Sequence, residues 1–373
     1  MILHPQSSRM RQMSGVRRLE SRRGIALIIV MISILVLAVL AGGFAIMMKT
    51  ETTLARNANN EAELEGLGRS GVEYCRWILA QEMNCPAEPY DSLCQIWAGG
   101  SGGACATNGP LLDVQREVQL GHGSFTWKMT DLESKWNINI AQEPILNQAM
   151  SAMGVDPSES VPVVGAILDW IDPDDREHVE GAENDYYHGL NPPYDCKNGP
   201  IDDISELLMI RGISQEMFWG PNATNHPASS WQRKMNRYGP SAAEPSYTAG
   251  LVDIFSPFGT GKLNINTASA AALQIIPMVD QPRAEAIVAA RSCDDDGTGQ
   301  MGPFRSVDAG YLFNRVPNLG LEAARMVQQY CDVRSRTFEV RIDAKINNYK
   351  REFVAVLGRN TPRDIQILTF YWK

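Results

Sequence analysis

The sequence has few of the residues and spacings on which common catalytic and metal sites depend. It contains five histidines in 373 residues, none in HExxH spacing, and no Walker phosphate-binding loop. No two cysteines have the CxxC spacing of a zinc site. Acidic residues outnumber basic ones after Gly24: the net charge of the whole chain is −9 and that of residues 1–24 is +5, so the rest carries −14. A phosphate backbone would repel such a body, and both catalysis and nucleic-acid binding are therefore disfavoured.

Cysteine, by contrast, is plentiful. Seven cysteines indicate an oxidising compartment such as the periplasm, because reduced compartments rarely keep disulfides. The odd total leaves at least one thiol unpaired, and the pairing cannot be read from the spacing. We expect Cys75 to be the single free thiol, because it lies in a predicted helix. The other six are Cys85, Cys94, Cys105, Cys196, Cys293 and Cys331.

A long apolar run predicts a membrane-spanning helix. Ile25 to Met48 contains no charge, and only Ser33 is clearly polar. As a helix these residues span about 36 Å, against a hydrocarbon core of ~30 Å. A secretory signal peptide has a shorter apolar region and a small-x-small cleavage site, whereas here a proline-free helical pattern continues to Gln81. We therefore predict one transmembrane and stem helix over 25–82, with the arginines before it in the cytoplasm.

The residues before the run form a basic leader, residues 1–24, that ends in Arg22-Arg23-Gly24. This leader resembles that of type IV prepilin-like proteins. The resemblance implies that prepilin peptidase cleaves between Gly24 and Ile25, and that the new amino terminus is methylated. Such proteins usually carry Glu at the fifth mature position, where this chain has Ile29. That carboxylate neutralises a neighbouring subunit's buried amino terminus, so its absence suits the first subunit, at a filament tip.

Alternating sequences predict an antiparallel sheet. Apolar residues recur at every second position in Val114–Leu120, Phe125–Met129 and Phe338–Ala344, and further strands are expected over Phe353–Leu357 and Ile365–Trp372. The fold class we predict is α+β: a pilin-like fold with a long N-terminal transmembrane helix packed on an antiparallel sheet. Its sheet domain comprises 83–135 and 332–373, and a large α-helical domain is inserted between them.

The predicted insert, 136–331, contains an imperfect repeat. Trp136–Ala141 resembles Leu263–Ala268, with Asn at matching positions that suit helix starts. Apolar residues at helical spacing follow each copy, so we predict two related halves, 137–215 and 264–330. The second copy also resembles the start of DNA-binding helix-hairpin-helix domains. Its turn, Pro277–Asp280, has no glycine and adds an acid, which disfavours phosphate binding.

Further motifs lie between the two copies. They are Asp169–Asp175 (DWIDPDD), Gly181–Tyr187 (GAENDYY), Asn198-Gly199-Pro200 and Ser205-Glu206-Leu207. Together with the leader and Ile29, the chain resembles the K-type minor pseudopilin of type II secretion systems. A minor pilin of a type IV pilus is the alternative, and the large insert favours secretion.

The resemblance implies a structural role. K-type proteins lie at the tip of a periplasmic pseudopilus with I-type and J-type minor pseudopilins, help to start its assembly, and so support export of folded proteins across the outer membrane. The expected location is the bacterial inner membrane, single-pass, with the C-terminal domain in the periplasm. No enzymatic activity and no nucleic-acid partner are expected.

An acidic segment predicts a calcium site. Only Arg176 and Lys197 oppose twelve acidic residues between Asp169 and Glu206, and calcium takes several oxygen ligands from irregular loops. A solvated acidic loop is the alternative. The resemblance also implies calcium in this domain. The ligands we predict are Asp172, Asp174, Asp175, Glu183, Asp185 and Asp202. A second acidic run, Asp294–Gly299, resembles an EF-hand start but lacks the closing Glu, so a polar turn is favoured.

Overall fold

A computed structural model describes residues 23–107, 109–221, 247–293 and 302–373. The predicted leader up to residue 22 and the acidic run Asp294–Gly299 lie outside these residues. The chain forms two compact units, one ending at Glu63 and the other comprising Leu64–Lys373. The fold below is that of the described part of each unit.

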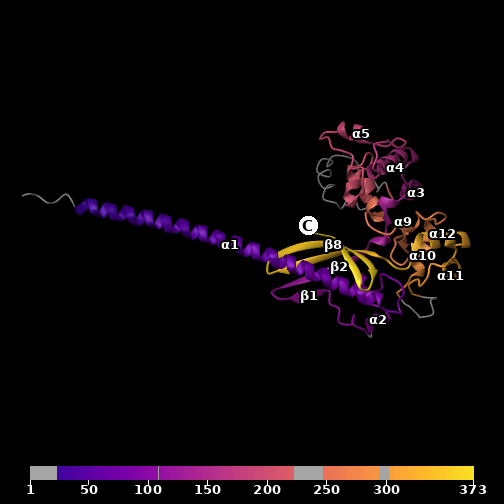
Figure 1. Cartoon of the computed structure of the whole chain (residues 1–373), viewed down its shortest axis with the longest axis horizontal. Coiled ribbons are helices and arrows are strands. Elements are labelled where there is room, and N and C mark those ends of the chain that lie inside the picture. Colours follow the sequence, from indigo (N-terminus) through magenta and orange to yellow (C-terminus); the bar gives the residue numbers. More distant parts are fainter. Residues whose placement is uncertain (1–22, 108, 222–246, 294–301) are drawn as a thin grey trace, which may run out of the picture. The chain divides into compact units, whose positions relative to one another are not determined.

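The helix α1 (Arg23–Met83) has 61 residues and begins close to the predicted start. Its apolar part is long enough and apolar enough to cross a membrane, and its side chains from Ile25 to Met48 are exposed. The Ser33 hydroxyl donates to the Ile29 carbonyl at 2.9 Å, so the helix itself satisfies this polar group. The predicted continuous helix is thus present (Figure 1).

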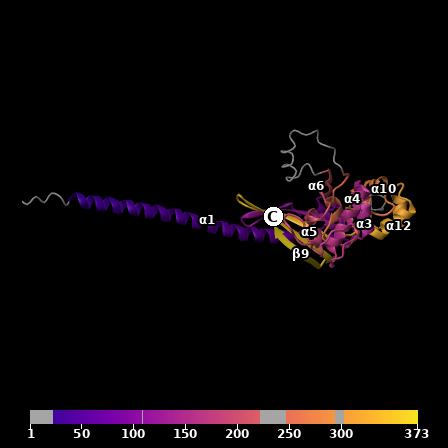
Figure 2. The same ribbon diagram turned by 90° about the horizontal axis from the view of Figure 1, so that it is seen from above.

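The sheet has five strands in the order β1-β2-β7-β8-β9, and every neighbouring pair is antiparallel. The strands are β1 (Glu117–Leu120), β2 (Gly123–Asp131), β7 (Thr337–Ile346), β8 (Tyr349–Thr361) and β9 (Asp364–Trp372). β2 ends opposite the start of β7, where Asp131 pairs with Phe338. The intervening chain therefore leaves and rejoins the sheet at one end, as Figures 1 and 2 show. The predicted α+β class is confirmed.

Alternation along the strands buries one face of the sheet against α1. In β7, Val340 and Ile342 are buried, whereas Arg341 between them is exposed. Two helix glycines allow close approach: a Cβ on Gly68 would lie 2.6 Å from the Phe353 ring, and one on Gly71 would lie 2.8 Å from Ile342. α1 thus packs directly on the sheet because it presents hydrogen atoms where side chains would otherwise stand.

The insert consists of two helical segments that share one hydrophobic core. The first contains β3 (Trp136–Asn137), α3 (Glu143–Met153), α4 (Pro157–Ile171), α5 (Asn184–His188), α6 (Gln215–Trp219), α8 (Leu251–Ile254) and β4 (Phe255–Ser256). The second contains β5 (Leu263–Asn264), α9 (Ala270–Leu273), α10 (Gln281–Ala290), α11 (Ala309–Arg315), α12 (Leu321–Tyr330) and β6 (Cys331–Asp332). A two-residue parallel bridge closes each segment, β3 with β4 and β5 with β6.

Short elements complete the described fold. They are the 3₁₀ helices η1 (Ile96–Ala98), η2 (Leu132–Ser134), η3 (Ile138–Ile140) and η4 (Ile204–Met209), and the one-turn helix α2 (Ala104–Thr107). The loop that follows α1, residues 84–110, contains η1 and α2. We call this segment the post-stem loop. It contacts the second helical segment.

The repeated Asn residues make matching contacts in the two segments. Asn139 exchanges two hydrogen bonds with the backbone of Ile201, and Asn266 exchanges two with the backbone of Phe304. Each partner follows a Gly-Pro pair, at 199–200 and 302–303. These second Asn side chains bind distant backbone instead of starting a helix, which corrects that part of the expectation. The first of each pair, Asn137 and Asn264, accepts from the backbone two residues on.

The cysteine prediction was partly wrong. Disulfides join Cys85 to Cys105 and Cys94 to Cys293. Cys75 is free, as predicted, but Cys196 and Cys331 are free too. Both belong to the hydrophobic core of the insert, where burial raises the pKa of Cys331 and raises that of Cys196 to about 11.

Candidate functional site

The acidic segment is folded against the end of α4. Asp169, on the last turn of this helix, is fully buried and accepts from the Ala182 N–H at 2.6 Å and the His178 N–H at 2.9 Å. The His178 Nδ1 lies 2.6 Å from the same carboxylate. Gly181 is required here, because a Cβ would fall 1.9 Å from Asp169 Oδ2. Asp169 therefore anchors the chain that carries Glu183.

Four oxygen atoms in this region are buried and accept no hydrogen bond. They are Asp172 Oδ1, both carboxylate oxygens of Glu183, and Asn198 Oδ1. Glu183 is only 8% exposed. Burial, followed by the charge of Asp169, raises the pKa of Glu183 to about 7, and burial also raises the pKa of Asp172. Oxygen atoms without donors are the kind of ligand that hard cations take, so the chemistry of these groups is compatible with calcium.

The structure brings some predicted ligands together and separates others. Asp175 Oδ1 accepts from the amides of Asn198 at 2.9 Å and Asn184 at 3.2 Å, which links it to the orphaned oxygens. Asp174 offers its backbone carbonyl to Asn198 at 3.2 Å, and its carboxylate accepts from the Arg176 N–H. Asp185 is exposed on α5.

Asp202 forms an ion pair with a lysine side chain. Its carboxylate lies 2.8 Å from Lys197 Nζ, with the side chain 85% exposed. Lys197 also contacts Glu206 at 2.8 Å, and Glu206 closes a capping box at η4. The ion pair thus occupies the carboxylate that sequence proximity assigned to the metal.

Three residues of the site were not among the predicted ligands. Asn198 contributes an orphaned amide oxygen at a positive φ of 45°. Asp169 and His178 form, with Asp172, a group whose candidate ligand atoms all lie within 4.8 Å of one another. The available signal was the helical i, i+3 spacing of Asp169 and Asp172 at the end of α4.

A second polar centre lies where the insert joins the sheet. Asp131, at the end of β2, accepts from Ser335 Oγ at 2.6 Å and from Asn264 Nδ2 at 3.2 Å. Asn264 also donates to the Asp91 carbonyl at 3.1 Å. Asp91 in turn forms a buried ion pair with Arg359. We call these five residues the junction network; sequence reasoning missed it, although the repeated Asn264 was its one visible member.

Burial governs the acids near this junction. Burial raises the pKa of Asp131 to about 6, despite hydrogen bonds from Ser335 and Thr267 that lower it. The neighbouring Glu133 is 2% exposed, and burial, then the charge of Asp131, raises its pKa to about 7. These groups lie where the insert joins the sheet, and neither Asp131 nor Glu133 lines the hollow described next.

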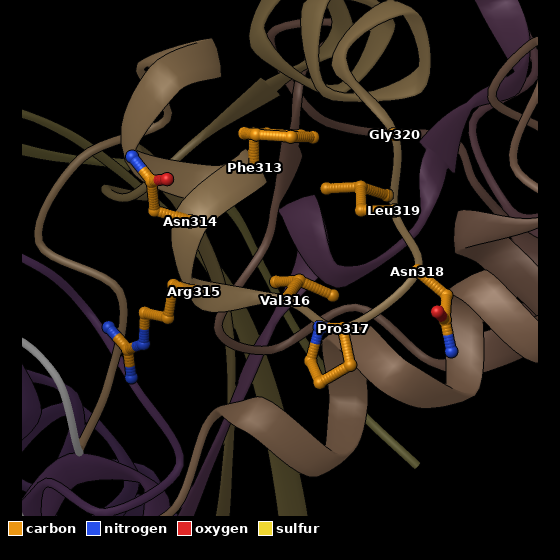
Figure 3. A pocket seen from close by; sticks show the side chains of 8 residues that line it. All are labelled: Phe313, Asn314, Arg315, Val316, Pro317, Asn318, Leu319 and Gly320. Carbon is orange, nitrogen blue, oxygen red and sulfur yellow. The ribbon is translucent and has the colours of Figure 1, made fainter.

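A hollow of about 510 Å³ lies at the turn between α11 and α12. Figure 3 shows its lining, Phe313 to Gly320, with Arg315 extending away from Phe313 and Leu319. Arg283 joins this turn to the predicted hairpin turn at Pro277–Asp280, donating to the carbonyls of Asn318 at 3.3 Å and Met278 at 2.9 Å. Arg283 therefore connects the two turns through hydrogen bonds to their backbones.

The predicted processing site lies at the start of α1. The helix begins at Arg23, so the Gly24–Ile25 bond falls within its first turn. Ile29 is 58% exposed within the apolar part of the helix. Cleavage after Gly24 and the role of Ile29 in assembly stay predictions.

The C-terminal part of α1 packs on an antiparallel sheet, and a helical insert lies between β2 and β7; this is the pilin-like fold that the sequence predicts. The fold matches a chain in the crystal structure of the GspK–GspI–GspJ complex from the enterotoxigenic Escherichia coli type 2 secretion system. That match has a TM-score of 0.61 and 17% identity, and covers 86% of this chain and 99% of that chain.

Sequence comparison narrows the class. Residues 129–219 match the family model for type II secretion system (T2SS) protein K. Type II secretion system protein K of Klebsiella pneumoniae is 24% identical over 53% of this chain and 60% of the relative. A putative protein K of Escherichia coli K12 is 23% identical, also over 60% of its length, and that of Pseudomonas aeruginosa is 21% identical over 94% of this chain and 92% of the relative. The predicted resemblance to protein K is confirmed.

Proposed function

We propose that this chain is the K-type minor pseudopilin of a type II secretion system, located at the tip of the pseudopilus. The observation that supports this most strongly is the helical insert: it interrupts a pilin-like sheet between β2 and β7, and its first part carries the protein K match. The type IV pilus alternative is not favoured, because the matching proteins are named for type II secretion.

The parts of the subunit suit a terminal position. A large helical insert is hard to accommodate inside a packed shaft, whereas the exposed apolar side chains of α1 are available for contacts with other subunits. Ile29 provides no carboxylate for a preceding subunit's amino terminus. We infer that the role is structural and not enzymatic, that the partners are I-type and J-type minor pseudopilins, and that the tip helps to start assembly for export across the outer membrane.

Processing and orientation complete the proposal. Prepilin peptidase cuts between Gly24 and Ile25, the new amino terminus is methylated, and α1 holds the protein in the inner membrane in a single pass. The six arginines of the leader stay in the cytoplasm. The body from Leu64 onward then lies in the periplasm, where its two disulfides are stable.

Calcium is the cofactor we propose. The residues that would hold it are Asp172, Asp175, Glu183 and Asn198. All but Asp175 carry buried oxygens without donors, and Asp175 accepts a hydrogen bond from Asn198. The ion would neutralise Glu183, the most costly group of the cluster. Asp174, Asp185 and Asp202 stay predicted ligands, with Asp202 paired to Lys197 in this arrangement.

Co-purification tests the proposed function. The full chain, expressed in membranes with the I-type and J-type minor pseudopilins of the same organism, should purify with both, and its deletion should abolish export of folded exoproteins. Expression with the minor pilins of a type IV pilus is the control. Association with the pilus set alone, or export that continues without the gene, would contradict the proposal.

A further inference from the structure

The post-stem loop contacts the second helical segment at several places. The buried contact is a hydrogen bond: Asn264 of β5 donates to the Asp91 carbonyl at 3.1 Å within the junction network. The exposed contacts come from Arg305, which donates to the Ala87 carbonyl at 3.1 Å and lies over the Tyr90 ring. Among the described residues, the covalent attachment is the bond between Cys94 and Cys293, which follows α10 by three residues.

The two disulfides of the chain differ in access and in span. Cys293 is exposed and Cys94 half-buried, whereas Cys85 is buried and Cys105 half-buried. Cys94 and Cys293 are 199 residues apart in sequence, while Cys85 and Cys105 are only 20 apart and lie within one loop. Thiol–disulfide exchange requires that a thiolate reach one sulfur, and the one exposed residue among these four cysteines, Cys293, belongs to the long-range bond.

We propose that the Cys94–Cys293 disulfide is a reducible lock that holds the second helical segment against the post-stem loop. A dithiol reductant opens it in two steps. One thiolate attacks Cys293 Sγ, forming a mixed disulfide and releasing Cys94 as a thiolate that takes up a proton. The second thiolate of the reductant then releases Cys293, so two electrons pass to the protein and the reductant becomes the disulfide.

Opening the lock leaves the sheet intact. The core between α1 and the sheet contains none of the four bonded cysteines. Besides the Asn264 and Arg305 contacts, the second segment shares one hydrophobic core with the first helical segment. The reduced form therefore keeps its place in the insert, and the end of α10, which adjoins Cys293, loosens.

Hydrogen exchange on the full chain in lipid nanodiscs tests the lock. In Cys94→Ser/Cys293→Ser, and in wild type reduced by the lowest dithiothreitol concentration that frees one pair, α10 amides should exchange about tenfold faster than in oxidised wild type. Amides of β7 and β8 should not change. Differential alkylation should show Cys94 and Cys293 freed at a lower dithiothreitol concentration than Cys85 and Cys105.

Cys85→Ser/Cys105→Ser is the matched control, and its α10 exchange should equal that of wild type. Unchanged α10 exchange after the long-range bond opens would overturn the proposal. Equal acceleration in β7 and β8 would also overturn it, because the bond would then be a general fold staple. Wild-type reduction keeps the test valid if the serine variant fails to fold. If Cys85 and Cys105 were freed at a lower dithiothreitol concentration than Cys94 and Cys293, the proposal would be wrong, because the long-range bond would not be the more reducible one.

Discussion

Glu183 and Glu133 are both buried carboxylates, but their surroundings give them different roles. Both carboxylate oxygens of Glu183 are buried without donors, whereas Glu133 accepts from the Thr337 hydroxyl at 3.3 Å. A buried charge without a partner is costly, so a bound cation would stabilise the ionised form of Glu183. Burial raises the pKa of Glu133, which favours its protonated form.

Calcium should stabilise the chain through Glu183. Millimolar calcium should raise the melting temperature of the wild-type chain, since a ligand at about 100 times its Kd adds ~2.7 kcal/mol. Glu183→Gln should lose most of this rise and should itself be no less stable without calcium, because the neutral amide removes a buried charge. Calorimetry with calcium and with a chelator measures both.

Asp202→Asn is the control for that experiment, because its carboxylate pairs with Lys197 and not with the orphaned oxygens. It should keep most of the calcium-dependent rise. An absence of any shift in wild type at millimolar calcium, or an equal shift in Glu183→Gln, would refute the proposed site.

Glu133 should make stability fall as pH rises. Its folded pKa of about 7 lies above its ordinary value of 4.5, so its contribution is complete below about pH 4.5 and is lost as pH rises towards 7. Glu133→Gln should remove ~1–3 kcal/mol of this loss. The difference in unfolding free energy between pH 5 and pH 7.5 measures it, and the exposed Glu117→Gln should behave as wild type. A steeper loss in Glu133→Gln than in wild type would contradict the assignment.

At the scale of elements, the contact between α1 and the sheet depends on small residues at particular helix positions. Gly68 faces Phe353 and Gly71 faces Ile342 at distances too short for any Cβ. Gly66, two residues before Gly68, faces nothing within 4 Å. The same residue type therefore serves packing at two positions and weakens the helix at the third.

Gly68→Ala and Gly66→Ala should change stability in opposite directions. The added methyl at 68 must displace the Phe353 ring, which should cost ~1–3 kcal/mol. The same change at 66 should add ~0.5–1 kcal/mol, because alanine is the better helix residue. Chemical denaturation of the two variants, side by side, checks both signs; a stabilising Gly68→Ala would show that α1 does not pack here as described.

At the scale of the whole molecule, a basic leader, an apolar stem and an acidic body follow one another along the chain. Charge separates the two ends of the membrane helix, and the body carries the disulfides and the insert. This order fits the single-pass topology that we propose, with the body in the periplasm.

The leader should be removed after Gly24. Coexpression with a prepilin peptidase should yield a protein whose amino terminus is Ile25, and Gly24→Val should keep the leader because the residue before the cut must be small. Intact-mass measurement and N-terminal sequencing report the result. Gly15→Val, within the same leader, should be cleaved as wild type; cleavage at any other bond would refute the predicted site.

Much of the fold could be predicted because it rests on local patterns. The uncharged run from Ile25 specifies a helix in apolar surroundings, and strict alternation in β7 specifies a half-buried strand. The repeat at Asn137 and Asn264 was also visible. The candidate metal site was predicted only as a neighbourhood, since spacing along an irregular loop does not fix which carboxylates converge.

What the sequence determined by itself was therefore the class of subunit: one apolar stem, a sheet, an interrupting insert and an acidic segment. Only the tertiary structure decided which groups meet. Lys197 takes Asp202, Asn198 joins Asp175, and Cys94 finds Cys293 across 199 residues. The physical reason is that the periodicity of helices and strands depends on neighbouring residues and can be read from the sequence. Partners far apart in sequence are selected by packing and by the need to satisfy buried polar atoms.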